Sequence, residues 1–139
     1  MMNYKKIAVA IDFSKQSLKA LDRAILIAKN NQATLLLVNV VDTKTFGSIA
    51  AYDLKYAKQL KIESETELDQ LKKQALEQGV PSVETLVAEG SPKEILTNIP
   101  EIGLIICGET GYNQVERLML GSVAERIVRY SKYDVLIVR

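Results

Sequence analysis

The sequence contains no histidine and only one cysteine, Cys107. The absence of histidine excludes metal sites, catalytic triads and general bases that depend on an imidazole ring. A single cysteine excludes an intrachain disulfide framework and fits a reducing compartment. Because Cys107 ends an apolar run, we interpret it as a small core residue rather than a reactive thiol.

The sequence also lacks an excess of charge of one sign and lacks long apolar runs. It has 18 Lys and Arg against 17 Asp and Glu, which gives a formal net charge of +1. Such a balance argues against nucleic-acid binding, which favours a strongly basic surface. Runs such as Leu35–Val38 are too short to span a bilayer, and residues 1–6 do not have the layout of a secretion signal. We therefore expect a cytoplasmic protein with neither a membrane nor a nucleic acid as its partner.

The 139 residues alternate between strand-like and helix-like hydrophobic patterns. Short apolar runs predict strands over residues 7–11, 34–41, 104–107 and 135–138. An alternating pattern predicts a further strand over 83–88, at an edge of the sheet. Helical spacing predicts four helices, over 14–31, 52–78, 91–98 and 122–130. Alternation of this kind favours a parallel sheet, because parallel strands need right-handed crossovers. The prediction is an α/β fold with an open parallel sheet, helices on both faces and one Rossmann-like domain spanning 1–139.

Two helix starts and one helix end carry clear local signals. Ser14 is a plausible N-cap, and Ser91 begins a Ser-Pro-Lys-Glu capping box with proline at the first helical position. Gly79 closes the helix over 52–78, and Pro81 prevents its continuation.

Ligands of open parallel sheets bind beyond the carboxyl ends of the strands, where the strand order reverses. The first and fourth strands are the natural neighbours at that point. The turns after them carry a carboxylate, Asp12, and two glycines, Gly108 and Gly111. Gly108 and Gly111 allow positive φ and close approach of backbone N–H groups to an anion. Gly121 and Ser122 begin the last helix, whose free N–H groups and dipole favour a phosphate.

A purely structural interpretation of these residues stays open. The segment Ser122–Glu125 is also a complete capping box, which explains the serine and the glutamate without a ligand. Gly108 is equally compatible with a tight turn. Asp12 is compatible with a helix cap, a role for which Ser14 competes.

The residues also resemble a known family over essentially the whole chain. The segments 7–14, 35–40, 104–108, 117–128 and 135–138 look like the universal stress protein family. The spacing G-x2-G-x9-G-S, formed by Gly108, Gly111, Gly121 and Ser122, resembles its ATP-binding branch. The resemblance implies a sheet of order 3-2-1-4-5 and an adenine nucleotide as ligand, either ATP or AMP or a relative, with Mg²⁺ or Mn²⁺. It also implies a homodimer formed through the last strand, Val135, Leu136, Ile137 and Val138, an apolar edge that needs a partner.

Carried over residue by residue, the resemblance implies a set of contacts with the nucleotide. Ala10, Ile11 and Val40 would line the adenine slot, largely through their main chain, and Asp12 would contact the nucleoside. Gly108 and Gly111 would face the ribose and the phosphates. Gly121, Ser122 and Val123 would bind the phosphates at the start of the helix.

Several positions depart from the family pattern, among them Asn39 and Glu109. Asn39 replaces a common histidine, and Glu109 places an acid inside the glycine turn, where it weakens binding if it faces the phosphates. We expect a stress-response protein that acts as a dimeric, nucleotide-dependent switch. The alternatives are a weak ATPase or phosphotransferase with Asp12 as metal or water ligand, a nucleotide-independent dimeric module, and a protein that binds a cyclic dinucleotide. The sequence has no Walker lysine motif, so we expect any hydrolysis of the nucleotide to be slow.

Overall fold

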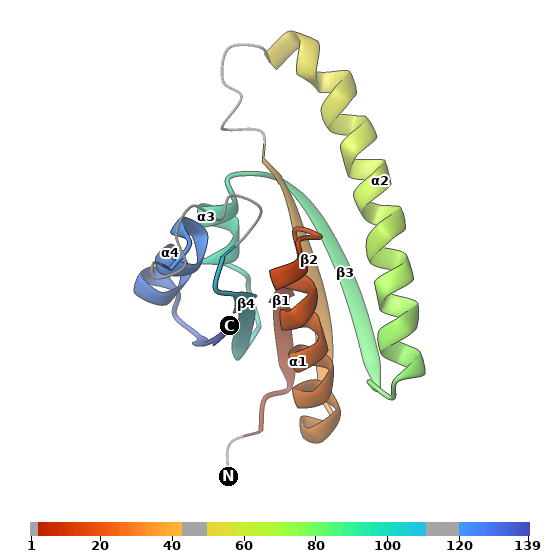
Figure 1. The fold of residues 1–139 in the computed structure, drawn as a ribbon, viewed down its shortest axis with the longest axis vertical. Helices are drawn as coiled ribbons and strands as arrows, with labels where there is room; N and C mark the ends of the chain where they lie inside the picture. The colour runs from red at the N-terminus through yellow and green to blue at the C-terminus, as the bar shows by residue number, and fades with distance from the viewer. Residues whose placement is uncertain (1–2, 43–49, 111–119) are drawn as a thin grey trace.

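The computed structural model describes residues 3–42, 50–110 and 120–139, in which strands and helices alternate (Figure 1). The strands are β1 Lys6–Ala10, β2 Thr34–Asp42, β3 Ser82–Gly90, β4 Leu104–Gly108 and β5 Asp134–Val138. The helices are α1 Lys15–Asn31, α2 Ala50–Glu77, α3 Pro92–Leu96 and α4 Ser122–Tyr130. These bounds lie within a few residues of those predicted from the hydrophobic pattern.

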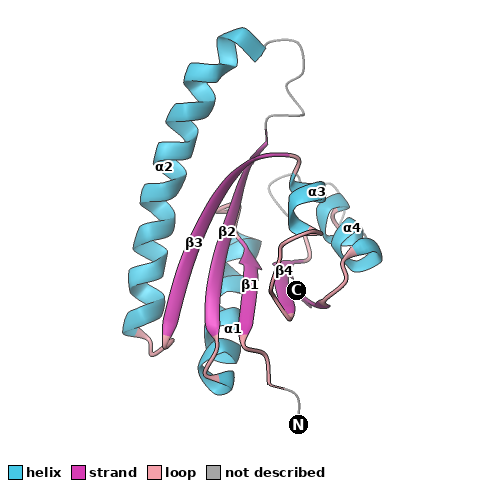
Figure 2. Cartoon of the chain, turned by 180° about the vertical axis from the view of Figure 1, so that it is seen from behind, coloured by secondary structure: helices cyan, strands magenta, loops and turns pink. Residues whose placement is uncertain are grey.

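The five strands form one parallel sheet in the order β3-β2-β1-β4-β5, as the resemblance implied. Figure 2 labels the first four of them in this order. The order reverses between β1 and β4, so the carboxyl ends of these two strands flank the predicted binding position. Pairing of β1 with β2 ends where Ala10 lies opposite Val38, but β2 continues to Asp42 beside β3. Among the described residues, no strand therefore covers the edge of β2 above the end of β1.

Helices cover both faces of the sheet, which confirms the predicted α/β architecture. Alternate residues of β1 point to opposite faces: Ile7 and Val9 belong to the core under α1 and α2, and Ala8 belongs to the core under α3 and α4. All three side chains have 0% exposure. A strand that is buried on both faces shows a continuous apolar run instead of an alternating one, which explains the pattern of residues 7–11.

Helix α1 begins as predicted. Ser14 is its N-cap, and the Ser14 hydroxyl accepts a hydrogen bond from the Ser17 N–H at 3.2 Å. The buried stripe of α1 contains Leu21, Ala24, Ile25 and Ala28, all of them at the predicted helical spacing. This stripe holds α1 against the first core, so the start of the helix has a fixed position above β1.

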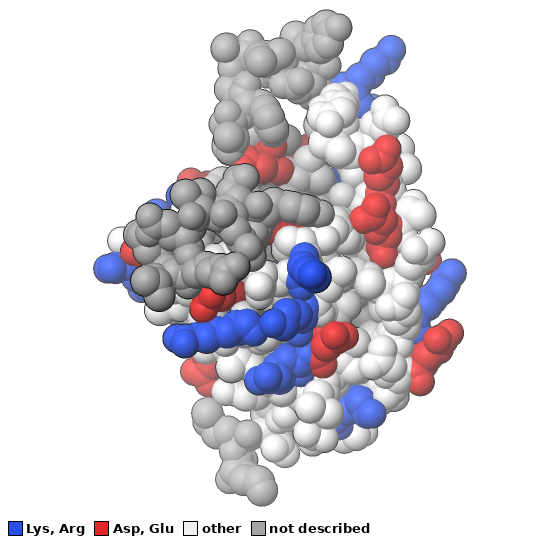
Figure 3. Space-filling model, in the orientation of Figure 1, with Lys and Arg blue, Asp and Glu red and all other residues white. Residues whose placement is uncertain are grey.

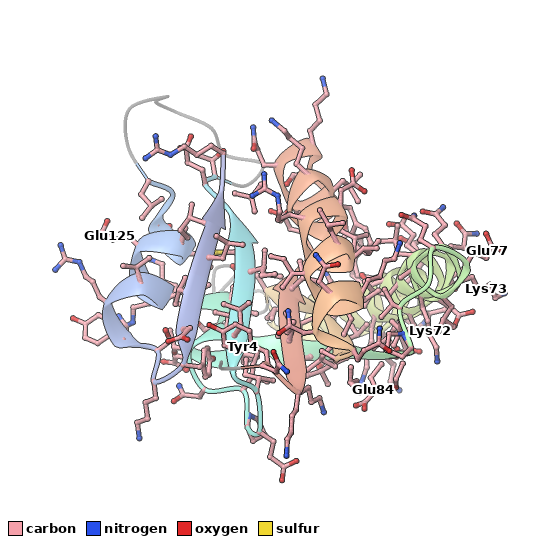
Figure 4. All side chains as sticks on the ribbon, turned by 90° about the horizontal axis from the view of Figure 1, so that it is seen from below. Tyr4, Lys72, Lys73, Glu77, Glu84 and Glu125 are labelled. Carbon is pink, nitrogen blue, oxygen red and sulfur yellow. The ribbon has the colours of Figure 1, made fainter. Side chains whose placement is uncertain are left out.

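Helix α2 runs along β3, and its N-terminal part reaches past the end of the sheet (Figure 1). Its C-terminal part buries Leu68 and Ala75 completely, whereas Ile62 is 63% exposed. Lys72, Lys73 and Glu77 project from the C-terminal part of α2 (Figure 4). Gly79 follows the helix with φ +107°, the left-handed conformation expected of a glycine that ends a helix.

Helix α3 begins after Ser91 as predicted, but Ser91 makes no side-chain capping bond, so that part of the prediction is wrong. A tertiary contact holds the other end of this short helix. The hydroxyl of Tyr133 donates to the carbonyl of Leu96 at 2.5 Å and accepts the N–H of Ile99 at 3.2 Å. Burial raises the pKa of Tyr133, and the hydrogen bond from Ile99 partly opposes that shift.

Acidic and basic side chains are mixed over the face drawn in Figure 3, as the small net charge leads one to expect. Among the described helices, none combines the length and the apolar character that a membrane crossing requires. At the end of the sheet where β1 begins, the hydroxyl of Tyr4 donates to the Asp134 carboxylate at 2.6 Å. Tyr4 is labelled in Figure 4. This bond ties the N-terminal segment to the first residue of β5.

Candidate functional site

A cleft of about 380 Å³ lies at the carboxyl ends of β1, β2 and β4, between the starts of α3 and α4. Its volume is in the range of sites for small organic ligands. It is lined by Ala10, Ile11, Asp12, Ser17, Val38, Val40, Asp42, Pro92, Leu96, Cys107, Gly108, Thr110, Gly121, Ser122, Val123 and Ala124. Apart from Asp42 at the end of β2, the wall is apolar on the side of the strands and α3, and it is more polar on the side of the turns and the start of α4.

The cleft brings together the residues that the sequence predicted for the nucleotide site, from five separate elements and turns. Those that line it are Ala10, Ile11, Asp12, Val40, Gly108, Gly121, Ser122 and Val123. Gly111, the remaining predicted residue, lies outside the described residues.

Asp12 lies in the bend that joins β1 to α1, and its side chain is exposed. Its carboxylate Oδ1 accepts the N–H of Ser14 at 3.0 Å, and its own N–H donates to the Ser17 hydroxyl at 3.3 Å. Phe13, between Asp12 and Ser14, has φ +64°, a left-handed conformation that is uncommon for residues other than glycine. Because Ser14 caps α1, Asp12 is not the helix cap, and the bend holds its carboxylate at the edge of the cleft.

Gly108 ends β4 at the floor of the cleft. Gly108 does not use the positive φ that glycine allows, because among the described glycines only Gly79 and Gly90 have one. The reason for glycine is instead close packing. A β-carbon at residue 108 would lie 3.0 Å from the carbonyl oxygen of Gln16, in the first turn of α1. The side-chain hydrogen of Gly108 is therefore what allows α1 to approach the end of β4.

The start of α4 forms another wall of the cleft. The N-cap is Gly121, Ser122 is already helical, and no side chain among the described residues caps the helix. The structural interpretation of Ser122–Glu125 as a capping box is therefore wrong. The N–H groups of the first helical turn have no partner within the helix, so the tip of α4 presents donors that the helix itself leaves unpaired, together with the positive end of the helix dipole.

Glu109, the acid inside the glycine turn, does not line the cleft. Its carboxylate Oε2 lies 3.4 Å from the Nε of Arg139, which is 88% exposed. Its main chain is bonded on both sides: the Glu109 N–H donates to the Val138 carbonyl at 2.9 Å, and its carbonyl accepts the Gly121 N–H at 2.8 Å. These bonds join the end of β5, the turn after β4 and the cap of α4.

Cys107 is buried at 5% exposure, which confirms the prediction of a core residue, and it also lines the cleft beside Gly108. Desolvation raises the pKa of its thiol from 9.0 to about 12. The thiol is therefore protonated at neutral pH and is unreactive as a nucleophile.

Comparison with known proteins assigns the family. The model of the universal stress protein family matches residues 3–139. The chain belongs to the universal stress protein family. A Staphylococcus saprophyticus relative that carries the family name is 42% identical over 143 residues, with 100% of this chain and 86% of the relative covered. A Staphylococcus haemolyticus relative is 41% identical over the same length, with 100% of this chain and 87% of the relative covered.

Solved structures agree with the fold of this universal stress protein. UspA from Lactobacillus plantarum matches with a TM-score of 0.92 and 25% identity, and each chain is covered completely. A universal stress protein solved in complex with cAMP matches with a TM-score of 0.68 and 26% identity, covering 99% of this chain and 98% of that one.

Several residues that line the cleft in this universal stress protein were not predicted as site residues. Pro92 and Leu96 come from α3, and Val38 and Asp42 come from β2. No local pattern distinguishes them from ordinary core and loop residues, because only the folded arrangement brings α3 over the end of β2. Asn39 does carry a local signal, because it is a polar residue inside the apolar run of β2.

Proposed function

We propose that this protein binds an adenine nucleotide in the cleft and acts as a nucleotide-responsive regulatory protein. The observation that carries the proposal is the convergence of an apolar slot, an uncovered strand edge and the uncapped tip of α4 on one cleft. A nucleotide needs all three features: a flat apolar surface for the base, hydrogen-bonding groups for its edge, and donors for its phosphates.

The slot for the base lies between the strands and α3. Ala10, Val38 and Val40 provide one wall, and Leu96 provides another. Val38 turns its carbonyl toward β1, where it accepts the Ile11 N–H at 2.8 Å. Since backbone orientation repeats every second residue in a strand, the N–H and carbonyl of Val40 point the same way, above the end of β1. A donor and an acceptor side by side complement N1 and the N6 amino group of adenine.

The phosphates are assigned to the start of α4. The N–H groups of Ser122 and Val123 belong to the first turn of the helix, where anions are favoured by the unpaired donors and the dipole. The Ser122 hydroxyl adds a donor at the same place, because it is not used as a cap. Gly121 contributes its small size, since its own N–H already donates to Glu109.

A divalent cation fits the acidic side of the cleft. Asp12 and Asp42 line it, and carboxylate oxygens are the ligands that Mg²⁺ and Mn²⁺ prefer. Such ions are usually held by one or two carboxylates together with the phosphates of the nucleotide. We assign to Asp12 a role beside a phosphate-bound ion, which would offset the repulsion between the carboxylates and a polyphosphate.

The relatives support the ligand class. A family member of 26% identity was solved with cAMP, a molecule that contains adenine, ribose and phosphate. The extent of the cleft, from the slot at Val40 to the tip of α4 at Ser122, suits the same three parts.

The proposed switch includes a homodimer formed along β5. This strand pairs only with β4, so its outer edge is unpaired among the described residues. The bonds from Gly121 to Glu109 and from Glu109 to Val138 connect the phosphate end of the cleft to this strand. A nucleotide that orders the start of α4 would therefore also act on the edge at which two copies meet.

Isothermal titration with ATP and Mg²⁺, AMP, cAMP and GTP tests the proposal, together with mass spectrometry of any nucleotide retained through purification. We expect the adenine nucleotides to bind at least about tenfold more tightly than GTP, a difference of about 1.4 kcal/mol. No heat and no thermal shift at millimolar adenine nucleotide would refute the proposal. Sustained phosphate release that is lost in Asp12→Ala would instead favour the ATPase alternative.

A substitution at Gly121 separates binding from stability. Gly121 has φ −59°, which any residue adopts, and Asp and Asn are both strong helix caps. Gly121→Asp should keep or raise thermal stability but weaken nucleotide binding at least about tenfold, because it puts a negative charge beside the phosphates. Gly121→Asn is the matched control without the charge and should bind more tightly than Gly121→Asp. Equal binding by the two variants would contradict the assignment of phosphates to this helix tip.

A further inference from the structure

The hydrogen-bond ladder between β1 and β2 changes at Ile11. Its N–H makes the regular ladder bond, donating to the Val38 carbonyl at 2.8 Å. In a regular parallel ladder, the next bond would run from the Val40 N–H to the Ile11 carbonyl. The Val40 N–H and the Ile11 carbonyl, both in the described part of the chain, do not form that bond. The side-chain amide of Asn39 takes its place, and its Nδ2 donates to the Ile11 carbonyl at 2.8 Å.

This replacement separates the main chains of β1 and β2 at the mouth of the cleft. The Ile11 carbonyl has a partner, and the Val40 N–H is relieved of its ladder partner. Both Ile11 and Val40 line the cleft. The strands therefore part without leaving the Ile11 carbonyl, which belongs to a residue with 2% exposure, unsatisfied.

Asn39 is itself buried, with 6% exposure, and it lies in the apolar run of β2. Its Oδ1 is buried and has no hydrogen-bond partner among the described residues. Half of the amide is thus unsatisfied, which is unfavourable in a core. The other half of the amide, the Nδ2 donor that holds the Ile11 carbonyl, offsets part of that cost.

We propose that Asn39 is a positioning residue for the base of the bound nucleotide. Its side-chain N–H substitutes for the Val40 N–H at Ile11, so that the Val40 N–H stays available to the base. It also anchors the start of the bend in which the Asp12 N–H donates to Ser17 at 3.3 Å. The inference rests on the proposed nucleotide site, and it adds a residue that lies behind that site and does not touch the ligand.

Two substitutions at Asn39 differ in whether the new side chain can donate a hydrogen bond to the Ile11 carbonyl. Asn39→Leu has a similar size but no donor, so the Ile11 carbonyl is expected to accept the Val40 N–H and close the ladder. Asn39→His retains a ring N–H that can donate to Ile11. Because Asn39→Leu removes a buried and partly unsatisfied polar group, it need not lower stability. A loss of binding in this variant would therefore not be a result of unfolding.

Amide hydrogen exchange by NMR, without nucleotide, tests the hydrogen-bond arrangement directly. We expect the Val40 amide to exchange at least about tenfold faster in the wild type than in Asn39→Leu, where it gains a partner. Asn39→His should resemble the wild type. Equal protection of Val40 in the wild type and Asn39→Leu would overturn the proposal, whatever the protein binds.

Titration of the same three proteins with AMP and with ATP and Mg²⁺ tests the consequence for binding. Asn39→Leu should lose at least about tenfold in affinity without a matching fall in melting temperature, and Asn39→His should stay within about threefold of the wild type. Wild-type affinity in Asn39→Leu would overturn the role of Asn39 and leave the nucleotide site standing. If the wild type binds no adenine nucleotide, the proposed function is refuted. The exchange measurement needs no nucleotide, so it still tests the hydrogen bond of Asn39 separately.

Discussion

Gly108 and Gln16 are packed so closely that a β-carbon on Gly108 would lie 3.0 Å from the Gln16 carbonyl oxygen. Gly108 ends β4, and Gln16 lies in the first turn of α1. Since the main chain of Gln16 cannot move without shifting α1, this contact sets the distance between the helix and the strand. It also sets the place of the Asp12 bend, which leads into α1, relative to the turn after β4.

Gly108→Ala should therefore destabilise the protein by about 1–3 kcal/mol, the usual cost of forcing extra volume into a packed interior. Urea unfolding measures the loss. Adding Gln16→Ala should not restore stability, because the obstacle is the main-chain carbonyl of Gln16 and not the end of its side chain. Wild-type stability in Gly108→Ala would show that α1 has room to move.

Tyr133→Phe should cost about 1–3 kcal/mol, because it leaves the Leu96 carbonyl and the Ile99 N–H without the hydroxyl that serves both. Both residues are buried, so water does not readily replace the lost bonds. Tyr130→Phe is the matched control: Tyr130 is 62% exposed, and its ring faces the Arg126 guanidinium at 4.6 Å. Its stability should change by no more than about 0.5 kcal/mol. Similar losses in both variants would contradict the role of the Tyr133 hydroxyl.

Cys107 should react slowly with thiol reagents at pH 8, because its pKa is raised to about 12 and the thiolate is the reactive form. The folded protein holds this proton more tightly than the unfolded chain, so stability falls as the pH rises above the ordinary value of 9.0 toward 12. Cys107→Ala should flatten that decline between pH 9 and about 10.5. Unfolding experiments across this range provide the measurement, and an unchanged slope would argue against a buried neutral thiol.

Glu109→Gln should change nucleotide affinity by less than about threefold, because the Glu109 carboxylate faces Arg139 and not the cleft. Stability should change by about 1 kcal/mol at most, since Arg139 is 88% exposed and exposed ion pairs are weak. Calorimetric titration of the variant gives the affinity. A gain of tenfold or more on removal of the charge would indicate that Glu109 repels the phosphates after all.

Val135→Pro should convert the proposed homodimer into a monomer. The Val138 carbonyl and the Asp134 N–H face β4, where they bond to Glu109 and Gly103, so the main-chain groups of Val135 face outward. Proline at this position removes an outward N–H, a change tolerated at a sheet edge. Sedimentation of wild type and variant measures the assembly. Leu136→Pro, which removes an N–H on the β4 side, should instead lower the melting temperature sharply.

Much of the fold follows from the order of hydrophobic patterns along the chain. Continuous apolar runs such as 7–11 predicted strands buried on both faces, and Ile7, Ala8 and Val9 are indeed fully buried. The start of α1 was equally local, because the Ser14 cap depends only on residues three positions apart. The cleft residues were predicted by resemblance to the family, and those that the structure describes lie together.

Tertiary structure decided what each of those residues does. Gly108 is glycine because of a helix about ninety positions away in the chain, which no pattern around residue 108 reveals. Ser122 looked like a helix cap, but the chain enters α4 one residue earlier, at Gly121. The amide of Asn39 holds Ile11, 28 positions away. Short-range periodicity and capping are properties of neighbouring residues, so the sequence alone determines them. Contacts between distant segments exist only once the strands and helices have packed.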